Sequence, residues 1–254
     1  MNKNSLKNIA SQVIDLEINA LKILKKSVDK NFDKAVNTIV NCQSKIILCG
    51  VGKSGLIAAK IASTLSSVGS PAFSLSANDC LHGDLGSITR KDVLILISNS
   101  GKSEEIIPII KFANRNKIKL IGIVSKKNSF LYKGSDIKIL LPEVKESGLG
   151  VVPTSSTSIQ LAIGDALAIA SLKKKQFSKY DFSRLHPGGN LGKQLKTVED
   201  VMASGTKIPF INENKNMKEA TKIISKKKLG VVIARNKNKI TTGNNVSLFE
   251  NKLK

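Results

Sequence analysis

Hydroxyl and glycine residues gather in four short turns of this sequence, and these residue types suit the binding of a phosphate group. The turns are Gly50-Val51-Gly52-Lys53-Ser54-Gly55, Ser98-Asn99-Ser100-Gly101-Lys102-Ser103, Thr154-Ser155-Ser156-Thr157 and His186-Pro187-Gly188-Gly189. The first two each follow a strand-like apolar run and precede a helix-prone segment. Free backbone N–H groups and the helix dipole favour an anion at such a helix start. The sequence therefore predicts an α/β enzyme that holds a phosphate group.

The glycine turn matches the dinucleotide fingerprint Gly-x-Gly-x-x-Gly in form only. That fingerprint needs an acidic residue about 20 positions further on, and no Asp or Glu occurs between Gly50 and Asp79. A P-loop would need a glycine at position 47, which is Ile47. What remains is a lysine and a serine, Lys53 and Ser54, at a helix start, and this pair suits a sugar phosphate.

The serine-rich turn offers more hydroxyls than a helix start requires. A cap needs one hydroxyl, and this turn has three together with an amide, which favours a ligand with several oxygen atoms. The side chains of the two hydroxyl-rich turns that we predict to contact the substrate are Ser98, Asn99, Ser100, Ser103, Thr154 and Ser155.

Four titratable side chains lie near these turns in the sequence. The chain has only two histidines, His82 and His186, and both lie in glycine-flanked loops, where a structural and a catalytic role are both open. Glu105 follows the serine-rich turn and is either a first-turn helix acid or a proton acceptor. Glu146 lies in a loop and is either a surface charge or a second proton acceptor.

Size and composition allow one sizeable α/β core and a small additional module in 254 residues. No apolar run approaches the length of a membrane span, and the N-terminus lacks the apolar stretch of a signal peptide. The three cysteines, Cys42, Cys49 and Cys80, have no metal-like spacing, and their odd number favours reduced thiols in the cytoplasm. We therefore expect a cytoplasmic protein without a membrane partner, in which Cys49 is a core residue.

The net charge of +22 raises the question of nucleic-acid binding. The charge is spread along the chain, with +3 in residues 1–43, +12 in residues 44–197 and +7 in residues 198–254. Only four of the 41 basic residues are arginine, and tryptophan is absent. Base-reading surfaces rely on arginine and stacking aromatics, so we expect no nucleic-acid partner. A diffuse positive field would still attract a phosphorylated substrate.

Hydrophobic periodicity predicts a doubly wound α/β fold with three layers. The predicted strands are residues 45–49, 71–75, 93–98, 120–125 and 136–141, and the predicted helices are residues 5–28, 32–40, 54–65, 103–115, 128–133 and 154–173. Unbroken apolar strands are typical of parallel sheets that are buried on both faces. Ligands of such sheets bind at the carboxyl ends of the strands, where all the turns above fall. Beyond residue 197 we expect a helix at 217–228 and a strand at 230–234, and no structure in the polar segment 241–254.

Seven short motifs of the sequence, taken in their order along the chain, resemble those of the sugar isomerase (SIS) domain of the arabinose-5-phosphate isomerase family. They are Gly-x-Gly-Lys-Ser-Gly, His-Gly-Asp, Ser-Asn-Ser-Gly-x-Ser-x-Glu, Lys-Glu, Pro-Thr-Ser-Ser-Thr, Gly-Asp-Ala-Leu-Ala and His-Pro-Gly-Gly. The resemblance covers residues 5–197 and implies a five-stranded parallel sheet, a homotetramer and isomerisation of D-ribulose 5-phosphate to D-arabinose 5-phosphate. It also implies a role in supplying 3-deoxy-D-manno-octulosonate for lipopolysaccharide.

The resemblance implies roles for individual residues. The family's catalytic lysine, two glutamates and histidine fall on Lys53, Glu105, Glu146 and His186, and Ser54 assists the serine-rich turn at the phosphate. His82 matches a further active-site histidine that reaches a neighbouring subunit's site. The reaction needs a base for the C–H bond and stabilisation of the enediolate charge, and it requires no metal or redox cofactor.

Two departures from the family pattern separate this chain from its typical members. The loop after Glu146 is one residue short, and residues 198–240 resemble only the first of two cystathionine-β-synthase (CBS) repeats. We thus divide the chain into N-terminal helices (1–43), an SIS domain (44–197) and a partial CBS-like segment with a tail (198–254). Two alternatives stay open: a sugar-phosphate-binding module without turnover, and an isomerase of another sugar phosphate.

Overall fold

Five parallel strands form the central sheet of the first of two compact units, Met1–Leu195 and Lys196–Lys254. The computed structural model describes residues 5–186, 198–236 and 239–240. The elements of the first unit are α1 (Leu6–Ser27), α2 (Lys30–Val40), β1 (Ile46–Gly50), α3 (Lys53–Ser67), β2 (Ala72–Ser76), α4 (Ala77–Cys80), η1 (Asp84–Ser87), β3 (Val93–Ser98), α5 (Ile106–Arg115), β4 (Lys119–Val124), α6 (Phe130–Gly134), β5 (Ile137–Leu140), α7 (Ser155–Lys174) and α8 (Lys179–Leu185). The strand order is β2-β1-β3-β4-β5, which confirms the predicted five-stranded parallel sheet.

The position of each strand in the sheet follows from its apolar pattern. Every residue of β1 and β3 is buried, as unbroken apolar runs require of central strands. β5 at one edge alternates between buried and half-buried residues, and β2 at the other edge is half-buried or exposed throughout. The five strands lie within one residue of their predicted bounds at each end.

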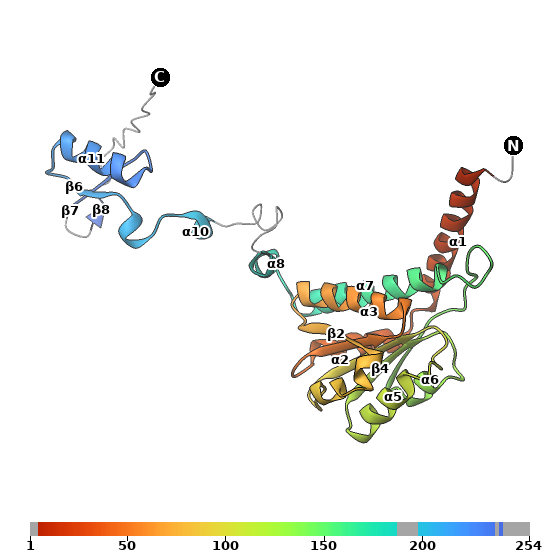
Figure 1. Cartoon of the computed structure of the whole chain (residues 1–254). Coiled ribbons are helices and arrows are strands. Elements are labelled where there is room, and N and C mark those ends of the chain that lie inside the picture. The colour runs from red at the N-terminus through yellow and green to blue at the C-terminus, as the bar shows by residue number, and fades with distance from the viewer. Residues whose placement is uncertain (1–4, 187–197, 237–238, 241–254) are drawn as a thin grey trace. The chain divides into compact units, whose positions relative to one another are not determined.

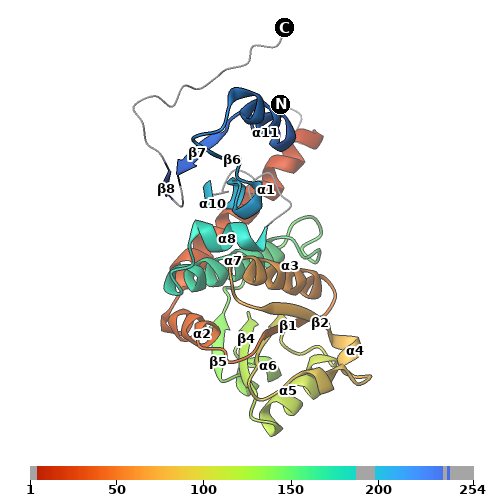
Figure 2. The ribbon, with the colours of Figure 1, turned by 90° about the vertical axis from the view of Figure 1, so that its left-hand side faces the viewer.

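Helices cover both faces of the sheet and make the three predicted layers. In Figure 1, α3 and α7 lie on one side of the sheet and α5 and α6 on the other, and Figure 2 shows the same layers after a quarter turn. Two apolar clusters fill the two interfaces, one around Ile61 and Ile97 and the other around Ile109 and Leu96. β1 leads to α3 on one face and β3 leads to α5 on the opposite face. The carboxyl ends of β1 and β3 therefore form the switch point at which such sheets bind ligands.

The two N-terminal helices were predicted correctly, and they are covered to different extents. Ala35, Val36 and Ile39 of α2 are buried in the core. Only Ala20 and Leu24 of α1 are buried. Val13 and Leu16 are half-buried, and six of its large apolar residues are more than a third exposed: Leu6, Ile9, Ile14, Ile18, Leu21 and Ile23. The described part of the chain thus leaves an apolar surface of α1 uncovered.

Three short elements of the first unit, α4, η1 and α8, do not appear in the predicted pattern, because four to seven residues carry too little periodicity. The predicted helix at 103–115 begins instead at Ile106. Gly101 has a φ of +64°, and the segment from Gly101 to Glu105 forms a turn in place of the first helical turn.

The second unit contains α10 (Val198–Val201), η2 (Gly205–Lys207), β6 (Phe210–Asn212), α11 (Met217–Lys227), β7 (Ile233–Asn236) and β8 (Lys239–Ile240). β6 pairs with β7 in parallel, and β8 pairs with β7 antiparallel. The Asn216 side chain caps α11, which ends one residue before its predicted limit. β7 begins three residues later than predicted, after Gly230 with its φ of +71°. Among the described helices of both units, none is long and apolar enough to cross a membrane.

A buried carboxylate, Asp92, fastens the amino edge of the sheet. Its oxygens accept hydrogen bonds from the N–H and hydroxyl of Thr89 at 2.6 and 2.8 Å, and from the backbone N–H and Nζ of Lys45 at 3.2 and 3.1 Å. Burial raises the pKa of Asp92, but hydrogen bonds from Ser44, Thr89 and Lys45 outweigh burial and bring the pKa to about 2. The carboxylate therefore links β1 to β3 at the edge opposite the predicted site.

Replacing Asp92 by asparagine is expected to lower the free energy of unfolding at pH 7 by about 2 kcal/mol, the equivalent of the pKa depression. The depressed pKa stabilises the folded chain fully above the ordinary value of 3.8. That stability is lost as the pH falls toward 2, so the variant and the parent should converge there. Urea unfolding between pH 2.5 and 7 measures this. Asp165→Asn, which removes the exposed partner of Lys60, is the control and should change stability by less than about 1 kcal/mol.

Candidate active site

The turn between β1 and α3 is held by close backbone contacts at two glycines. A Cβ atom on Gly50 would lie 2.8 Å from the backbone carbon and oxygen of Ser54, and one on Gly55 would lie 2.8 Å from the oxygen of Gly50. Gly52, which precedes α3, has a φ of +57°, a conformation that favours glycine. These glycines bring the first turn of α3 directly against the end of β1, with Lys53 and Ser54 at the helix start.

Gly50→Ala is expected to destabilise the chain by about 1–3 kcal/mol and to displace Ser54. The added methyl group meets backbone atoms, which cannot rotate away as a side chain can. Thermal unfolding and titration with inorganic phosphate measure the two effects. Gly86→Ala is the matched control, because its Cβ would meet open space. Equal stability of the two variants would contradict the close approach.

Hydrogen bonds shape the serine-rich turn after β3 and leave its hydroxyl hydrogens available. Ser98 Oγ accepts from the N–H of Gly101 at 3.0 Å, and Ser100 Oγ accepts from the N–H of Lys102 at 3.3 Å. Asn99 Oδ1 accepts from the hydroxyl of Ser125 at 2.7 Å. A hydroxyl that accepts can still donate its own hydrogen. Ser98 and Ser100 can therefore each donate to an anion.

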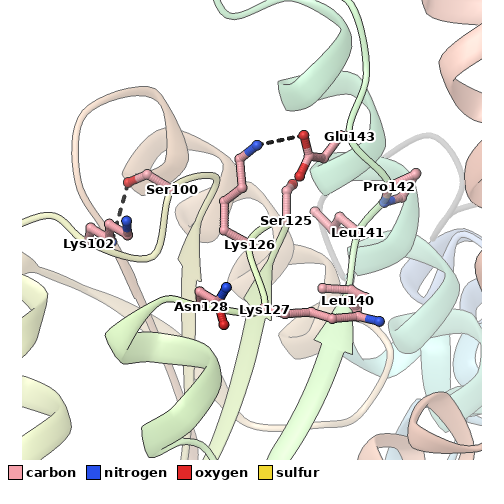
Figure 3. Close-up of a pocket in the computed structure, with 10 residues that line it drawn as sticks. All are labelled: Ser100, Lys102, Ser125, Lys126, Lys127, Asn128, Leu140, Leu141, Pro142 and Glu143. Atoms are coloured by element: carbon pink, nitrogen blue, oxygen red, sulfur yellow. Dashed lines mark hydrogen bonds and ion pairs between the residues drawn. The ribbon is translucent and has the colours of Figure 1, made fainter.

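A pocket of about 540 Å³ opens beside this turn, at the carboxyl ends of β3, β4 and β5 (Figure 3). The residues that line it are Ser100, Lys102, Ser125, Lys126, Lys127, Asn128, Leu140, Leu141, Pro142 and Glu143. Lys126 Nζ lies 2.6 Å from Glu143 Oε2. The Lys126 side chain is about half exposed and the Glu143 side chain about two-thirds, so this ion pair contributes little to stability and can open. Three lysines against one carboxylate give the pocket a positive charge that suits an anionic ligand.

Sequence reasoning missed most of this pocket, although one signal pointed to it. Ser125 ends the predicted strand 120–125, so it lies at the same sheet edge as Ser98. Neither Lys53 nor Glu105 lines the pocket. The turn after β1 lies next to the turn after β3 because Gly50 pairs with Ile97 in register.

Glu146 binds the amino end of α7. Its Oε2 accepts hydrogen bonds from the N–H of Thr154 at 2.8 Å, from the hydroxyl of Thr154 at 3.1 Å and from the N–H of Ser156 at 3.3 Å. Burial raises the pKa of Glu146, but the hydrogen bonds from Ser156 and Thr154 lower it by more, so the pKa lies below its usual value. The Ser147 N–H also donates to Thr154 Oγ1 at 3.0 Å. Glu146 is thus ionised and fixes the loop that enters α7.

Ser54 connects the glycine turn to the same helix. Its hydroxyl donates to Oε1 of Gln160 at 3.1 Å, and Gln160 is completely buried. Nε2 of Gln160 and the hydroxyl of Ser155 are buried without a hydrogen-bond partner in the described structure. Leaving a buried donor unpaired costs about 1–3 kcal/mol. Sequence reasoning missed Gln160, whose only signal was a polar residue within an apolar helix pattern.

Lys53 and Glu105 are the candidate catalytic groups that remain unengaged. Lys53 is exposed at the first position of α3, and Glu105 is half-buried immediately before α5. Neither side chain has a hydrogen-bond or ion-pair partner among the residues that the structure describes. Ser103, two residues before Glu105, is half-buried in the same turn. Lys53 and Glu105 each follow one of the two strands at the switch point.

The two histidines occupy different places. His82 is exposed in the turn between α4 and η1. His186 follows α8, where its ring stacks on Phe182 at 3.9 Å and its Nδ1 lies 2.8 Å from the Phe182 carbonyl oxygen. The rest of the predicted His186 turn, residues 187–189, lies outside the described residues.

The prediction that the His186 turn falls at the carboxyl edge of its own sheet is wrong, because helix α7 carries His186 away from that edge. The helix begins beside Glu146 at that edge, and at its far end Lys175 Nζ donates to the carbonyl oxygen of Gly69 at 3.0 Å. Gly69 precedes β2 and so lies at the amino edge. Because the 20 residues of α7 span about 30 Å, α8 and His186 lie far from Ser54 of the same chain.

Comparison with known proteins agrees with this geometry. The SIS domain family matches residues 39–170. An arabinose 5-phosphate isomerase KdsD of Francisella tularensis is 41% identical over 252 residues, which are 96% of this chain and 77% of that protein. A KdsD of Yersinia pestis is 40% identical over 224 residues, 87% of this chain and 68% of that protein. A solved Escherichia coli CFT073 protein in complex with arabinose 5-phosphate has a TM-score of 0.70 and 34% identity, and covers 74% of this chain and 100% of its own.

The sheet order, the switch-point turns and these matches define a phosphosugar isomerase built on an SIS domain. More narrowly, the chain belongs to the arabinose 5-phosphate isomerase family.

Proposed function

We propose that the chain interconverts D-ribulose 5-phosphate and D-arabinose 5-phosphate through a cis-enediol. The observation that carries this proposal is the pair of adjacent turns after β1 and β3, which present Lys53, free serine hydroxyls and Glu105 at one edge of the sheet. The names of the relatives and the sugar phosphate bound in the similar solved structure support this substrate. The product would supply 3-deoxy-D-manno-octulosonate and lipopolysaccharide synthesis in the cytoplasm.

The phosphate group is proposed to bind the serine-rich turn. Ser98, Ser100 and Ser103 donate to its oxygens with help from Ser54, while Asn99 holds the turn through Ser125. Thr154 contacts the sugar from the amino end of α7, whereas Ser155, which the sequence predicted as a second contact, is completely buried and is not proposed to touch the sugar. Lys53 neutralises the oxyanion charge that develops on the enediolate. Holding the phosphate fixes the sugar carbons relative to the base, which lowers the entropic cost of the reaction.

Glu105 is proposed as the base that moves the proton between C1 and C2. Its carboxylate is unengaged, whereas the carboxylate of Glu146 accepts three hydrogen bonds and has a lowered pKa, which makes it the weaker base. Glu146 acts instead by holding Thr154 and the amino end of α7 in place. His186 transfers protons at the sugar oxygens or opens the ring.

The position of His186 implies a site shared between chains. Its own chain places it beyond the far end of α7, so the histidine that serves one site is proposed to come from a neighbouring copy. His82, exposed on its turn, would reach a neighbouring site in the same way. The uncovered apolar surface of α1 supplies a contact between copies, in a homotetramer.

The test is NMR of the purified chain with D-ribulose 5-phosphate in deuterated water. We expect D-arabinose 5-phosphate carrying deuterium at C2, because the enediol is protonated from exchanged solvent. A different product sugar would replace the substrate assignment and keep the isomerase. Tight binding without conversion would instead favour a sugar-phosphate-binding module.

The second unit is proposed to derive from one CBS-like repeat. The stretch from β6 to β8 holds one βαβ unit, with α11 between the parallel strands β6 and β7. The sequence resemblance covers a single repeat, so we propose no nucleotide site formed by a pair of repeats in this chain.

A further inference from the structure

A buried amide accepts a hydrogen bond from one hydroxyl of the proposed phosphate site. Gln160 lies in the second turn of α7 and is 0% exposed. Its Oε1 accepts the hydroxyl hydrogen of Ser54 at 3.1 Å, while its Nε2 is buried without a partner in the described part of the chain. Buried polar groups are almost always paired, so an unpaired amide nitrogen calls for a physical reason.

The direction of this hydrogen bond decides what Ser54 can do. A serine hydroxyl has one hydrogen to donate, and here that hydrogen goes to Gln160. Ser54 can therefore not donate to an anion in this arrangement. Ser98 and Ser100 differ, because their oxygens accept hydrogen bonds and their hydrogens remain available.

Rotating the Gln160 amide by half a turn exchanges its oxygen and nitrogen. Nε2 would then donate to Ser54 Oγ, and the Ser54 hydrogen would be released toward the anion site. The rotation gives the unpaired nitrogen a partner at the expense of Oε1. Unpaired carbonyl oxygens are tolerated better than unpaired N–H groups. A phosphate oxygen that accepts from Ser54 would therefore favour the rotated amide.

We propose that Gln160 is a positioning residue for phosphate binding, whose buried amide turns over so that Ser54 donates to the phosphate. This inference rests on the proposed function, because it takes Ser54 as a phosphate contact. Gln160 touches no reacting atom and acts through Ser54 alone. It should therefore change the affinity for phosphate and leave the chemical step intact.

Gln160→Glu tests the need for a donor at this position. Burial at this position raises the pKa of a carboxyl group, so we expect the introduced carboxyl group to be neutral at pH 5.5 and ionised at pH 8. A neutral carboxyl group has a donor and an acceptor as the amide does, but an ionised one only accepts and repels the phosphate. We expect the variant to bind inorganic phosphate about as well as the parent at pH 5.5 and about tenfold more weakly at pH 8. At each pH the dissociation constant of the variant is divided by that of the parent, and this ratio removes the effect of the ionisation of phosphate itself. A ratio that does not change with pH would overturn the inference.

A double-mutant cycle tests whether Gln160 acts through Ser54. Gln160→Met, of similar size, should weaken phosphate binding about tenfold in the parent and less than about twofold in the Ser54→Ala background. The value of kcat should change by less than about twofold. Equal effects in both backgrounds, or no effect in the parent, would refute a role through Ser54.

A third measurement is made on the parent chain, and a variant is needed only to assign the signals. With glutamine labelled by ¹⁵N, saturating inorganic phosphate should shift the Nε2 signals of Gln160, which are assigned by their absence from Gln160→Glu. Unshifted signals would contradict the rotation even if Gln160→Met does not fold. If the parent binds and isomerises the sugar phosphate while these tests fail, only this inference falls. If the parent neither binds nor isomerises it, the proposed function falls as well.

Discussion

Glu105→Gln is expected to lower kcat by about 10²- to 10⁴-fold, the usual contribution of a positioned general base. Glutamine has the shape of glutamate but cannot accept the proton from the sugar carbon. The Glu105 side chain has no partner among the described residues, so its replacement should leave thermal unfolding unchanged. The assay is the conversion of D-ribulose 5-phosphate under saturating substrate, with KM measured separately.

The neighbouring residue provides a matched control for this prediction. Glu104 is exposed, and Glu104→Gln removes the same charge one position away, so it should keep near-parental turnover. Glu146→Gln is expected to lower thermal stability, because the ionised carboxylate accepts three hydrogen bonds at α7. Should Glu146→Gln lose turnover at unchanged stability while Glu105→Gln stays active, the base would be Glu146.

The core of the fold was predictable because its strands carry the strongest local signal. Apolar runs such as Val93–Ser98 are buried on both faces, and their bounds agree with the structure to within one residue. Cys49 is buried as predicted. The turns that follow these strands could be placed at one edge because parallel strands align their carboxyl ends. The elements of the first unit that escaped prediction were short, since α4, η1 and α8 each hold less than two full turns of sequence signal.

The site was only partly predictable, because its contacts join residues far apart in sequence. The Ser54–Gln160 hydrogen bond links positions 106 residues apart, and no local pattern marks it. The role of Glu146 depends on the path of the loop to Thr154, which the sequence identifies only as polar. The pocket lined by Lys126 and Glu143 forms where β4 and β5 end side by side. To predict this pocket, one must know that these two strands are neighbours in the sheet.

Two inactive variants are expected to restore activity when their chains are mixed. Lys53→Ala and His186→Ala should each lower kcat by about 10²-fold or more, since one removes the charge at the enediolate and the other a proton-transfer group. If each site takes Lys53 from one chain and His186 from another, random mixing leaves both groups intact in about one quarter of the sites. The mixture should then show about a quarter of the parental activity after unfolding and refolding together.

The outcome separates a shared site from a site within one chain. If His186 served its own chain, every site in the mixture would lack one group, and mixing would restore nothing. Refolding each variant alone is the control for recovery by refolding itself. The path of α7 predicts the first result, since Glu146 fixes the start of this helix at one edge of the sheet and Lys175 fixes its end at the other. Restored activity in the mixture would mean that catalysis requires the association of chains.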